Sequence, residues 1–240
     1  MNMIKVIFFD MGNTLLHFHY GKTDNEKDME GLIHVTQYLN KLDENITLYE
    51  VKNEFYNTWM EGIKDRKITY KEYPIEEFLN KFLHKYKINL TKEQCIEIIN
   101  LFYTEYREQV YFEEDIYKTL DKLKSKGYKI GIISNTCYYD EVMIECFKKV
   151  KIYNLIDSFT FSYSLRVGKP NKSIFIEALN KMNIAPEESV MVGDSLEKDI
   201  KPALDIGMNA ILYNSKNHIE YIDNKPYKEI NKISQLLNIL

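Results

Sequence analysis

The sequence lacks long hydrophobic runs and is poor in cysteine. None of its apolar stretches approaches the roughly 20 residues that a membrane-spanning helix needs. The apolar segment at the N-terminus is short and is not arranged as a signal peptide, so we expect a cytoplasmic protein without a membrane partner. Cys95, Cys137 and Cys146 are odd in number and show no disulfide or metal-ligand spacing, which fits a reducing compartment.

An excess of positive charge is also missing. The formal net charge is −4, and the basic residues are interspersed with acidic ones. Because nucleic-acid surfaces need clustered Lys and Arg, we expect no nucleic-acid partner. A chain of 240 residues with 45% hydrophobic residues is long enough for one large domain, or for a core with a substantial insertion.

Two different patterns divide the chain. Between about residues 24 and 109 apolar residues recur at helical spacing, for example every fourth position over 51–63 and as a stripe over 75–83. Capping boxes at 47–50 and 91–94 mark two helix starts. We therefore expect a helical bundle without strands in this stretch.

The remaining sequence alternates between strand and helix patterns. Such alternation predicts an α/β fold with a Rossmann-like, doubly wound parallel sheet. We assign residues 1–16 and 110–240 to this α/β core and residues 17–109 to an inserted helical-bundle cap domain. The expected strands are 3–9, 128–133, 159–161, 190–192 and 210–213, and the expected helices are 116–123, 140–147, 171–182, 197–206 and a last one within 233–240.

Asp10 directly follows the first apolar strand and opens a glycine-containing turn. The C-terminal edge of a parallel sheet is where α/β proteins bind ligands, so the carboxylate emerges at that edge. Beside a cation, such a carboxylate can attack phosphorus and form an aspartyl-phosphate.

Three further polar segments fall at ends of the predicted strands. Ser134 and Asn135 follow the second strand and offer a hydroxyl and an amide to a phosphoryl oxygen. Lys169 lies in the loop before a helix, where it can neutralise phosphate charge. Asp194 and Asp199 lie between a strand and a helix, and Mg²⁺ prefers such hard oxygen ligands.

These four segments, in this order, resemble the motifs of haloacid dehalogenase-like (HAD) hydrolases. The resemblance spans the chain, because the helical insert lies where this family places a helical cap of the first type, which indicates subfamily I. It implies a hydrolase of the phosphoric monoester type that acts through an aspartyl-phosphate on Asp10 and takes Mg²⁺ as cofactor. The implied partner is a small phosphorylated substrate.

The resemblance also implies a metal site. Asp10 would be both nucleophile and metal ligand, and Gly12 would offer its backbone carbonyl. Asp194 would bind Mg²⁺ directly. Asp199 would either bind it through water or orient Lys169, and the sequence leaves both roles open.

On the substrate side, the resemblance implies that Ser134 and Asn135, with nearby backbone N–H groups, hold the transferring phosphoryl group. Lys169 would contact both the phosphate and Asp10, and it therefore counts among the catalytic and the phosphate-binding residues. Positioning and charge neutralisation are the main needs of phosphoryl transfer, and these residue types provide both.

The first motif departs from the family form Asp-x-Asp-Gly-Thr-Leu at Gly12 and Asn13. The second Asp of that form acts as general acid and base, which is typically worth ~10²–10⁴-fold in rate. Three explanations stay open. The leaving group needs no acid, as in an acyl phosphate or a phosphonate-type substrate; His17, His19 or Tyr20 substitutes; or the protein is a slow or inactive relative.

The function that the sequence favours is Mg²⁺-dependent hydrolysis of a small phosphorylated metabolite. Within the hydrolases, a phosphonatase-like enzyme and a metal-independent dehalogenase-like enzyme compete with it. From another class comes a catalytically weak phosphate-binding or regulatory relative, which Gly12 favours and the intact remainder of the motifs disfavours.

Overall fold

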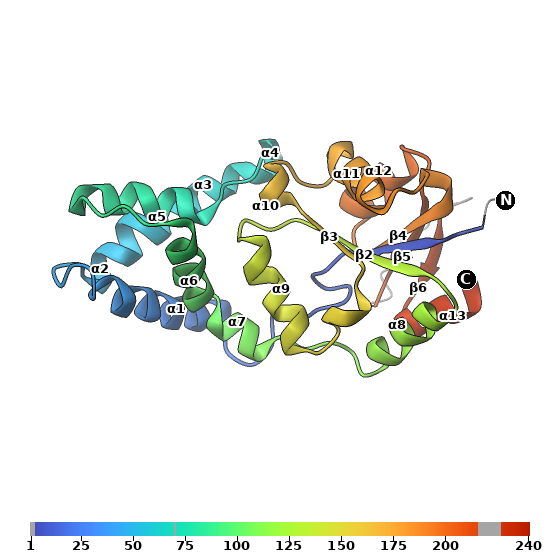
Figure 1. Cartoon of the computed structure of the whole chain (residues 1–240), viewed down its shortest axis with the longest axis horizontal. Coiled ribbons are helices and arrows are strands. Elements are labelled where there is room, and N and C mark those ends of the chain that lie inside the picture. Colours follow the sequence, from blue (N-terminus) through green and yellow to red (C-terminus); the bar gives the residue numbers. More distant parts are fainter. Residues whose placement is uncertain (1–2, 70, 216–226) are drawn as a thin grey trace. The chain divides into compact units, whose positions relative to one another are not determined.

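The computed structural model describes residues 3–69, 71–215 and 227–240. Within these ranges, six parallel strands form one sheet in the order β3-β2-β1-β4-β5-β6 (Figure 1). The predicted parallel α/β sheet is thus confirmed. The strands are β1 (Val6–Phe9), β2 (Lys129–Ser134), β3 (Ser158–Phe161), β4 (Ser189–Gly193), β5 (Asn209–Tyr213) and β6 (Lys228–Ile230).

The central strand β1 determines where polar groups emerge. All four of its residues are buried, as expected for a strand covered on both faces. Phe9 is in register with Ile132 of β2 and with Val192 of β4. The residues that follow these three strands therefore lie side by side at one edge of the sheet.

Helices cover both faces of this sheet. Figure 1 shows α11 (Lys172–Met182) and α12 (Lys201–Leu204) on one side of the strands, and α8 (Asp115–Ser125) and α13 (Leu236–Ile239) on the other. This is the doubly wound arrangement that the alternating pattern predicts. The predicted end of α8 is also correct, since Gly127 takes a left-handed φ of 93° two residues after the helix.

Between residues 24 and 109 the named elements are helical throughout the described residues, as predicted. The capping boxes at Thr47 and Thr91 are both formed, and a third box, which sequence reasoning missed, begins α1 at Thr23. The elements are α1 (Asp24–Leu39), α2 (Leu48–Glu50), the π-helix η1 (Val51–Tyr56), α3 (Asn57–Gly62), η2 (Ile63–Asp65), α4 (Arg66–Thr69), α5 (Ile75–Leu83), η3 (His84–Tyr86), α6 (Lys92–Phe102) and α7 (Thr104–Gln109).

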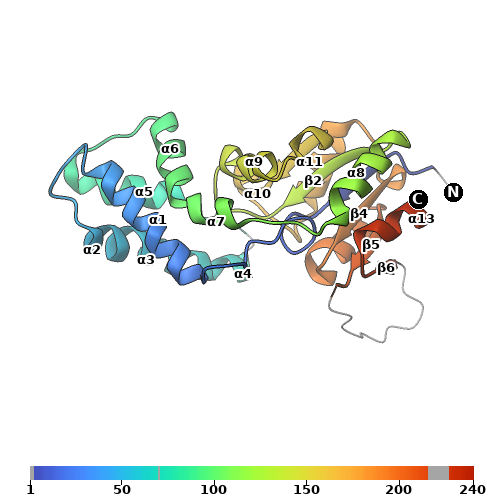
Figure 2. The same cartoon turned by 90° about the horizontal axis from the view of Figure 1, so that it is seen from below.

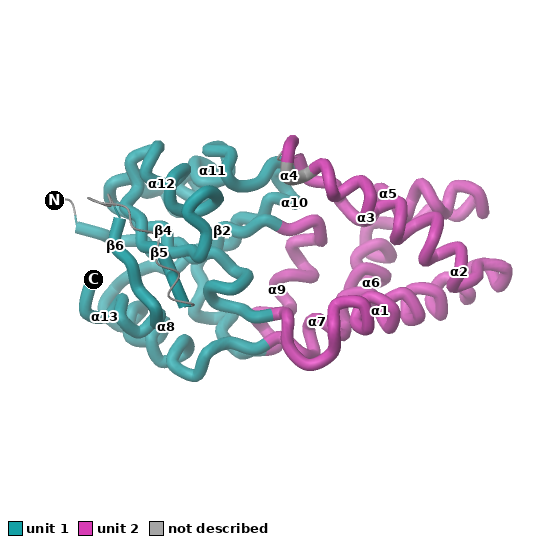
Figure 3. The backbone as a smooth tube through the Cα atoms, turned by 180° about the vertical axis from the view of Figure 1, so that it is seen from behind, with its two compact units in different colours: residues 1–17, 111–135, 150–240 teal, residues 18–110, 136–149 magenta. Residues whose placement is uncertain are grey.

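The contacts divide the chain into two compact units, coloured in Figure 3. The α/β unit comprises 1–17, 111–135 and 150–240, and the helical unit comprises 18–110 and 136–149. The second segment of the helical unit carries α9 (Asp140–Lys149), which the sequence analysis assigned to the α/β part. In the described ranges, none of the helices combines the length and apolar character that crossing a membrane requires.

The C-terminal region differs from the prediction in three details. β6 extends the sheet beside β5 (Figure 2), but it has three residues, of which only Ile230 is buried. So short a strand leaves no alternating pattern to detect. The expected helix 197–206 begins as a π-helical turn, η6 (Leu196–Ile200), before α12. The last expected helix is η7 (Ile233–Gln235) followed by the short α13.

Candidate active site

Asp10 lies at the C-terminal edge of the sheet, between the ends of two neighbouring strands. Its backbone N–H donates to the carbonyl of Val192 at 2.9 Å, which continues the β1–β4 ladder by one residue. Ser134, the last residue of β2, is buried on the other side. The Asp10 side chain is almost fully buried, so its charge needs partners within the protein.

Lys169 provides the main partner of Asp10. Its buried ammonium donates to Asp10 Oδ1 at 2.5 Å, to Asp199 Oδ1 at 2.6 Å and to the carbonyl of Ile133 at 3.0 Å. These three bonds use all three N–H donors of the ammonium. Burial alone opposes the lysine charge, but the two carboxylates outweigh it and raise the pKa of Lys169 above its ordinary value. The lysine therefore stays charged.

Asn135 fixes the loop that carries Lys169. The Asn135 amide donates from Nδ2 to the carbonyl of Lys169 at 2.8 Å, and its Oδ1 accepts from the backbone N–H of Lys169 at 2.7 Å. The side chain thus mimics a strand partner for one residue. Sequence reasoning missed this pairing, because a contact over 34 positions leaves no local signal.

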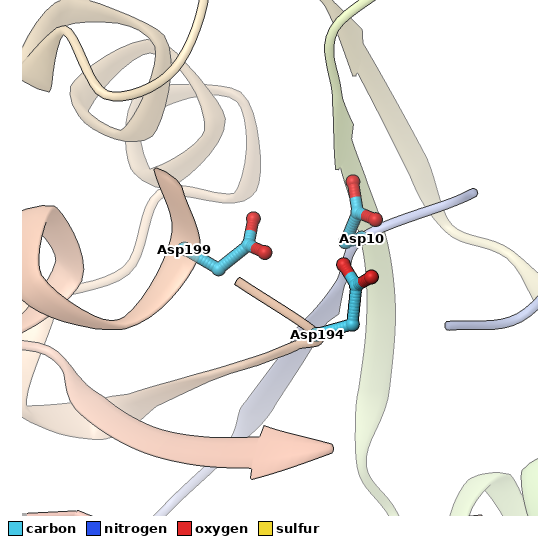
Figure 4. Close-up of side chains that lie close together, drawn as sticks. All are labelled: Asp10, Asp194 and Asp199. Carbon is cyan, nitrogen blue, oxygen red and sulfur yellow. The ribbon is translucent and has the colours of Figure 1, made fainter. Parts of the chain in front are cut away.

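Three carboxylates converge beside the lysine. Asp10, Asp194 and Asp199 each place an oxygen within 4.8 Å of the others, and Figure 4 shows the three side chains directed into the same space. Asp194 is exposed, whereas Asp199 is fully buried. Partial desolvation and the charge of Asp10 raise the pKa of Asp194. Burial, followed by repulsion from Asp10, raises the pKa of Asp199 to about 7, against the opposing effect of Lys169.

Asp199 has little freedom to move. Its Oδ1 accepts from Lys169, and its Oδ2 accepts from the backbone N–H of Ser195 at 3.0 Å. The side chain also packs against Gly193, where an added Cβ would lie 2.4 Å from Asp199 Cγ. Since real Cβ atoms do not approach so closely, this position in the Gly-Asp segment requires glycine.

In the turn after Asp10, Asn13 and Gly12 differ in how far the backbone restricts the choice of residue. Asn13 has a left-handed φ of 59°, a conformation that Asn tolerates better than most non-glycine residues. Asn is thus a workable substitute for the glycine of the family form. Gly12 has no such constraint, and a Cβ added there would meet no heavy atom within 4 Å. One further residue of the turn, Thr14, is fully buried with its hydroxyl 3.5 Å from Asp10 Oδ2.

The structure gives the three residues considered as substitutes for a general acid other contacts. The His17 ring stacks on Tyr111, and its Nε2 lies 3.7 Å from Glu113 Oε1. Burial lowers the pKa of His17, an effect that the charge of Glu113 opposes. His19 and Tyr20 belong to the helical unit, where both are exposed and the His19 ring is bonded to a neighbouring aspartate.

Comparison with known proteins agrees with this geometry. The model of the haloacid dehalogenase-like hydrolase family matches residues 4–207. The chain belongs to this family. A protein of Pyrococcus furiosus named glyceraldehyde 3-phosphate phosphatase is 30% identical over 249 residues, which cover all of this chain and 94% of the relative. This hydrolase therefore has a relative that matches it over its full length, the helical segment included.

Other relatives match a smaller part. A protein of the same name from Methanothermobacter thermautotrophicus is 41% identical over 130 residues, or 51% of this chain, and the chain spans about half (55%) of that relative's length. Among solved structures, a HAD phosphatase from Thermococcus onnurineus has a TM-score of 0.62 at 24% identity, covering 98% of this chain and 97% of its own. At that identity the likeness shows the fold alone.

Proposed function

We propose that this hydrolase is a Mg²⁺-dependent phosphatase that acts on a small phosphorylated metabolite and forms an aspartyl-phosphate on Asp10. The observation that carries the proposal is the setting of Asp10. A carboxylate at the open edge of a parallel sheet is bonded to a buried, charged lysine and lies within 4.8 Å of two further carboxylates. The relatives named as phosphatases support the same reaction class.

The residues present fit a magnesium ion. Three carboxylates face one ammonium, so an excess of two negative charges remains when all of them are ionised. Hard oxygen donors of this kind suit Mg²⁺. Asp10, Asp194 and the backbone carbonyl of Gly12 would hold the ion. Asp199, whose two oxygens already accept hydrogen bonds, would position Lys169 and reach the ion only through water.

The bound ion would neutralise charge on the phosphoryl oxygens and on Asp10. In the first step, a carboxylate oxygen of Asp10 attacks phosphorus, and the bond from phosphorus to the leaving oxygen breaks. In the second step, water attacks phosphorus, the bond to Asp10 breaks, and phosphate is released. Lys169 contributes fixed positive charge to both steps, and Ser134 contributes its hydroxyl to the phosphoryl oxygens.

The carboxylate cluster also separates this proposal from its competitors. A metal-independent dehalogenase-like reaction does not require Asp194. Without a bound cation, this exposed carboxylate is repelled by the charge of Asp10. A Schiff-base reaction of the phosphonatase kind requires a lysine with a free amine. Lys169 does not provide one, because its ammonium is charged and all three donors are used, so this reaction would need a lysine of the helical unit.

The test is hydrolysis of p-nitrophenyl phosphate by the purified protein, with Mg²⁺ and with excess chelator. We expect turnover that requires Mg²⁺ and that Asp10→Asn abolishes, since the amide is a poor nucleophile. Trapping of a phosphorylated protein in acid-quenched wild type, absent in Asp10→Asn, would establish the intermediate. Unchanged turnover in Asp10→Asn would refute the assignment.

A further inference from the structure

The space beside Asp10 is filled on one side and empty on the other. Lys169 and Asp199 pack against the carboxylate on the filled side. On the other side the chain turns through Gly12, whose Cβ position has no heavy atom within 4 Å. A Cβ at this position, two residues after Asp10, would therefore meet no steric obstacle.

The groups that contact Asp10 have no proton to give to a departing oxygen. In the described part of the α/β unit, its carboxylate has two side-chain hydrogen-bond partners, Lys169 and Thr14. Lys169 uses its three donors on Asp10, Asp199 and the Ile133 carbonyl. Thr14 donates its single proton to Asp10 itself. The side chains that contact Asp10 thus supply positive charge to the reaction, but no general acid.

We propose that Gly12 restricts this enzyme to phosphoryl compounds whose leaving oxygen is stable as an anion at neutral pH. Acyl phosphates and phosphoanhydrides share this chemistry. The proposal rests on the phosphatase function above and narrows its substrate class. For an acyl phosphate, the bond from phosphorus to the acyl oxygen breaks, and the carboxylate leaves with the electron pair and takes up no proton.

In the second step, the leaving group needs no general acid at position 12. The aspartyl-phosphate is itself an acyl phosphate, and the Asp10 carboxylate leaves phosphorus as an anion. Water adds to phosphorus and releases one proton to solvent, so the products are carboxylate, hydrogen phosphate and a proton. An alkyl phosphate differs in the first step, because its alkoxide must be protonated as it leaves.

The experiment compares substrates that transfer the same phosphoryl group but differ in their leaving group. Acetyl phosphate, phenyl phosphate and glyceraldehyde 3-phosphate release a carboxylate, a phenolate and an alkoxide, whose conjugate acids have pKa values of roughly 4, roughly 10 and far higher, near that of water. For each substrate, kcat/KM is measured with Mg²⁺ for wild type, Gly12→Asp and Gly12→Asn, with the rate in Asp10→Asn subtracted as background. Because kcat/KM reports the first step, slow release of phosphate does not mask the result.

In wild type we expect kcat/KM to fall by at least ~10²-fold from acetyl phosphate to glyceraldehyde 3-phosphate. Gly12→Asp should raise the glyceraldehyde 3-phosphate value by ~10²–10⁴-fold and the acetyl phosphate value by less than ~10-fold, since only the alkoxide needs a proton. Gly12→Asn fills the same space without an ionisable group. Any effect that it has on the metal site should change the kcat/KM of all three substrates together, so the ratio between substrates should stay as in wild type.

Other outcomes overturn the proposal. If wild type hydrolyses all three substrates with kcat/KM within ~10-fold of one another, a donor other than the side chains that contact Asp10 protonates the leaving oxygen. An equal gain in Gly12→Asp and Gly12→Asn would mean that filled space, not a proton, is what the site lacks. In both cases activity abolished by Asp10→Asn leaves the phosphatase function standing, whereas activity that survives Asp10→Asn refutes that function as well. The wild-type series alone decides the matter if a Gly12 variant does not fold.

Discussion

The two sides of Asp10 are built differently. On what we call the closed side, Lys169, Asp199 and Asn135 are linked by short hydrogen bonds, and Lys169 and Asp199 are buried. On the open side, Gly12 has no side chain and Asp194 is exposed. Under the proposed function, this difference divides the tasks: the closed side would hold Asp10 in one position, and the open side would leave room for the substrate and the metal.

Substitutions on the closed side should also lower the stability of the folded protein most. Two carboxylates share one lysine away from water, and an ion pair of this kind is costly when one partner is removed. Gly12 and Asp194, on the open side, take no part in these buried ion pairs. Substitutions on the two sides should therefore differ in their effects on folding, and this expectation can be tested by matched variants.

Lys169→Met should have the largest effect. It leaves the buried Asp10 and Asp199 without a cation, so we expect activity to be lost and the free energy of unfolding to fall by about 3–5 kcal/mol. Burial already raises the pKa of Asp199 to about 7, and loss of the lysine raises it further. In the unfolded chain the same carboxyl titrates near 4. The folded variant thus binds more protons, and its stability should rise as the pH falls from 7 toward 4.

The measurement is urea unfolding of wild type and variant between pH 4 and pH 8. Lys201→Met serves as control, because that lysine forms an exposed pair with Glu197 and should change stability by less than about 1 kcal/mol. A Lys169→Met protein as stable as wild type at pH 8 would show that the closed side is not held by its charges.

Asp194→Asn tests the open side through the metal. At a Mg²⁺ concentration of 100 Kd, binding to the folded state adds ~2.7 kcal/mol, which for a chain of this size raises Tm by about 5–10 °C. Without Mg²⁺ the variant should unfold at or slightly above the wild-type temperature, because an exposed charge beside Asp10 is removed. With Mg²⁺ its Tm should stay nearly unchanged.

Glu197→Gln is the matched control for the metal experiment. It removes an exposed negative charge from the turn that follows Asp194 but lies outside the carboxylate cluster. Its Tm should rise with Mg²⁺ as in wild type. Equal Mg²⁺ responses in the two variants would mean that Asp194 does not bind the ion.

The sequence predicted the order of elements well, because the strands of this sheet are buried apolar runs and the helices carry marked apolar faces. It also predicted Asp10 and Asp194 at strand ends, since parallel strands place their C-terminal ends at one edge, and Lys169 in the loop before α11. It did not predict β6, whose three residues pair by backbone hydrogen bonds that any sequence can make. Nor did it assign α9 to the helical unit, since a helical pattern does not say what the helix packs against.

Within the site, residue types were predictable and their hydrogen-bond partners were not. The pattern indicated two roles for Asp199, and only the geometry shows that both of its oxygens are used by Lys169 and Ser195. The family resemblance implies a phosphate contact for the Asn135 amide, and the geometry adds its pairing with the Lys169 backbone. Such pairings depend on how distant loops meet at the sheet edge, and a sequence pattern carries no information on that.

Gly193→Ala and Gly12→Ala form a matched pair with opposite signs. A Cβ at Gly193 would collide with Asp199 on the closed side, so we expect a loss of about 1–3 kcal/mol in the free energy of unfolding. A Cβ at Gly12 meets nothing, and its backbone is not left-handed, so Ala should stabilise by about 0.4–1 kcal/mol by restricting the unfolded chain. Urea unfolding of both variants decides this, and a destabilising Gly12→Ala would show that the open side is packed after all.

Thr14→Val should have the smallest effect. The Thr14 hydroxyl lies 3.5 Å from Asp10 Oδ2, at the long limit for a hydrogen bond, so replacing it by a methyl group of the same shape should cost less than about 1 kcal/mol. We expect kcat/KM to stay within about 5-fold of wild type, and Thr14→Ser, which keeps the hydroxyl, to match it. A much larger loss in Thr14→Val, rescued by Thr14→Ser, would mean that the hydroxyl tightens onto Asp10 during turnover. Thr14 would then be a fixed donor to Asp10 outside the closed side, and the contrast between the two sides would hold for the resting protein only.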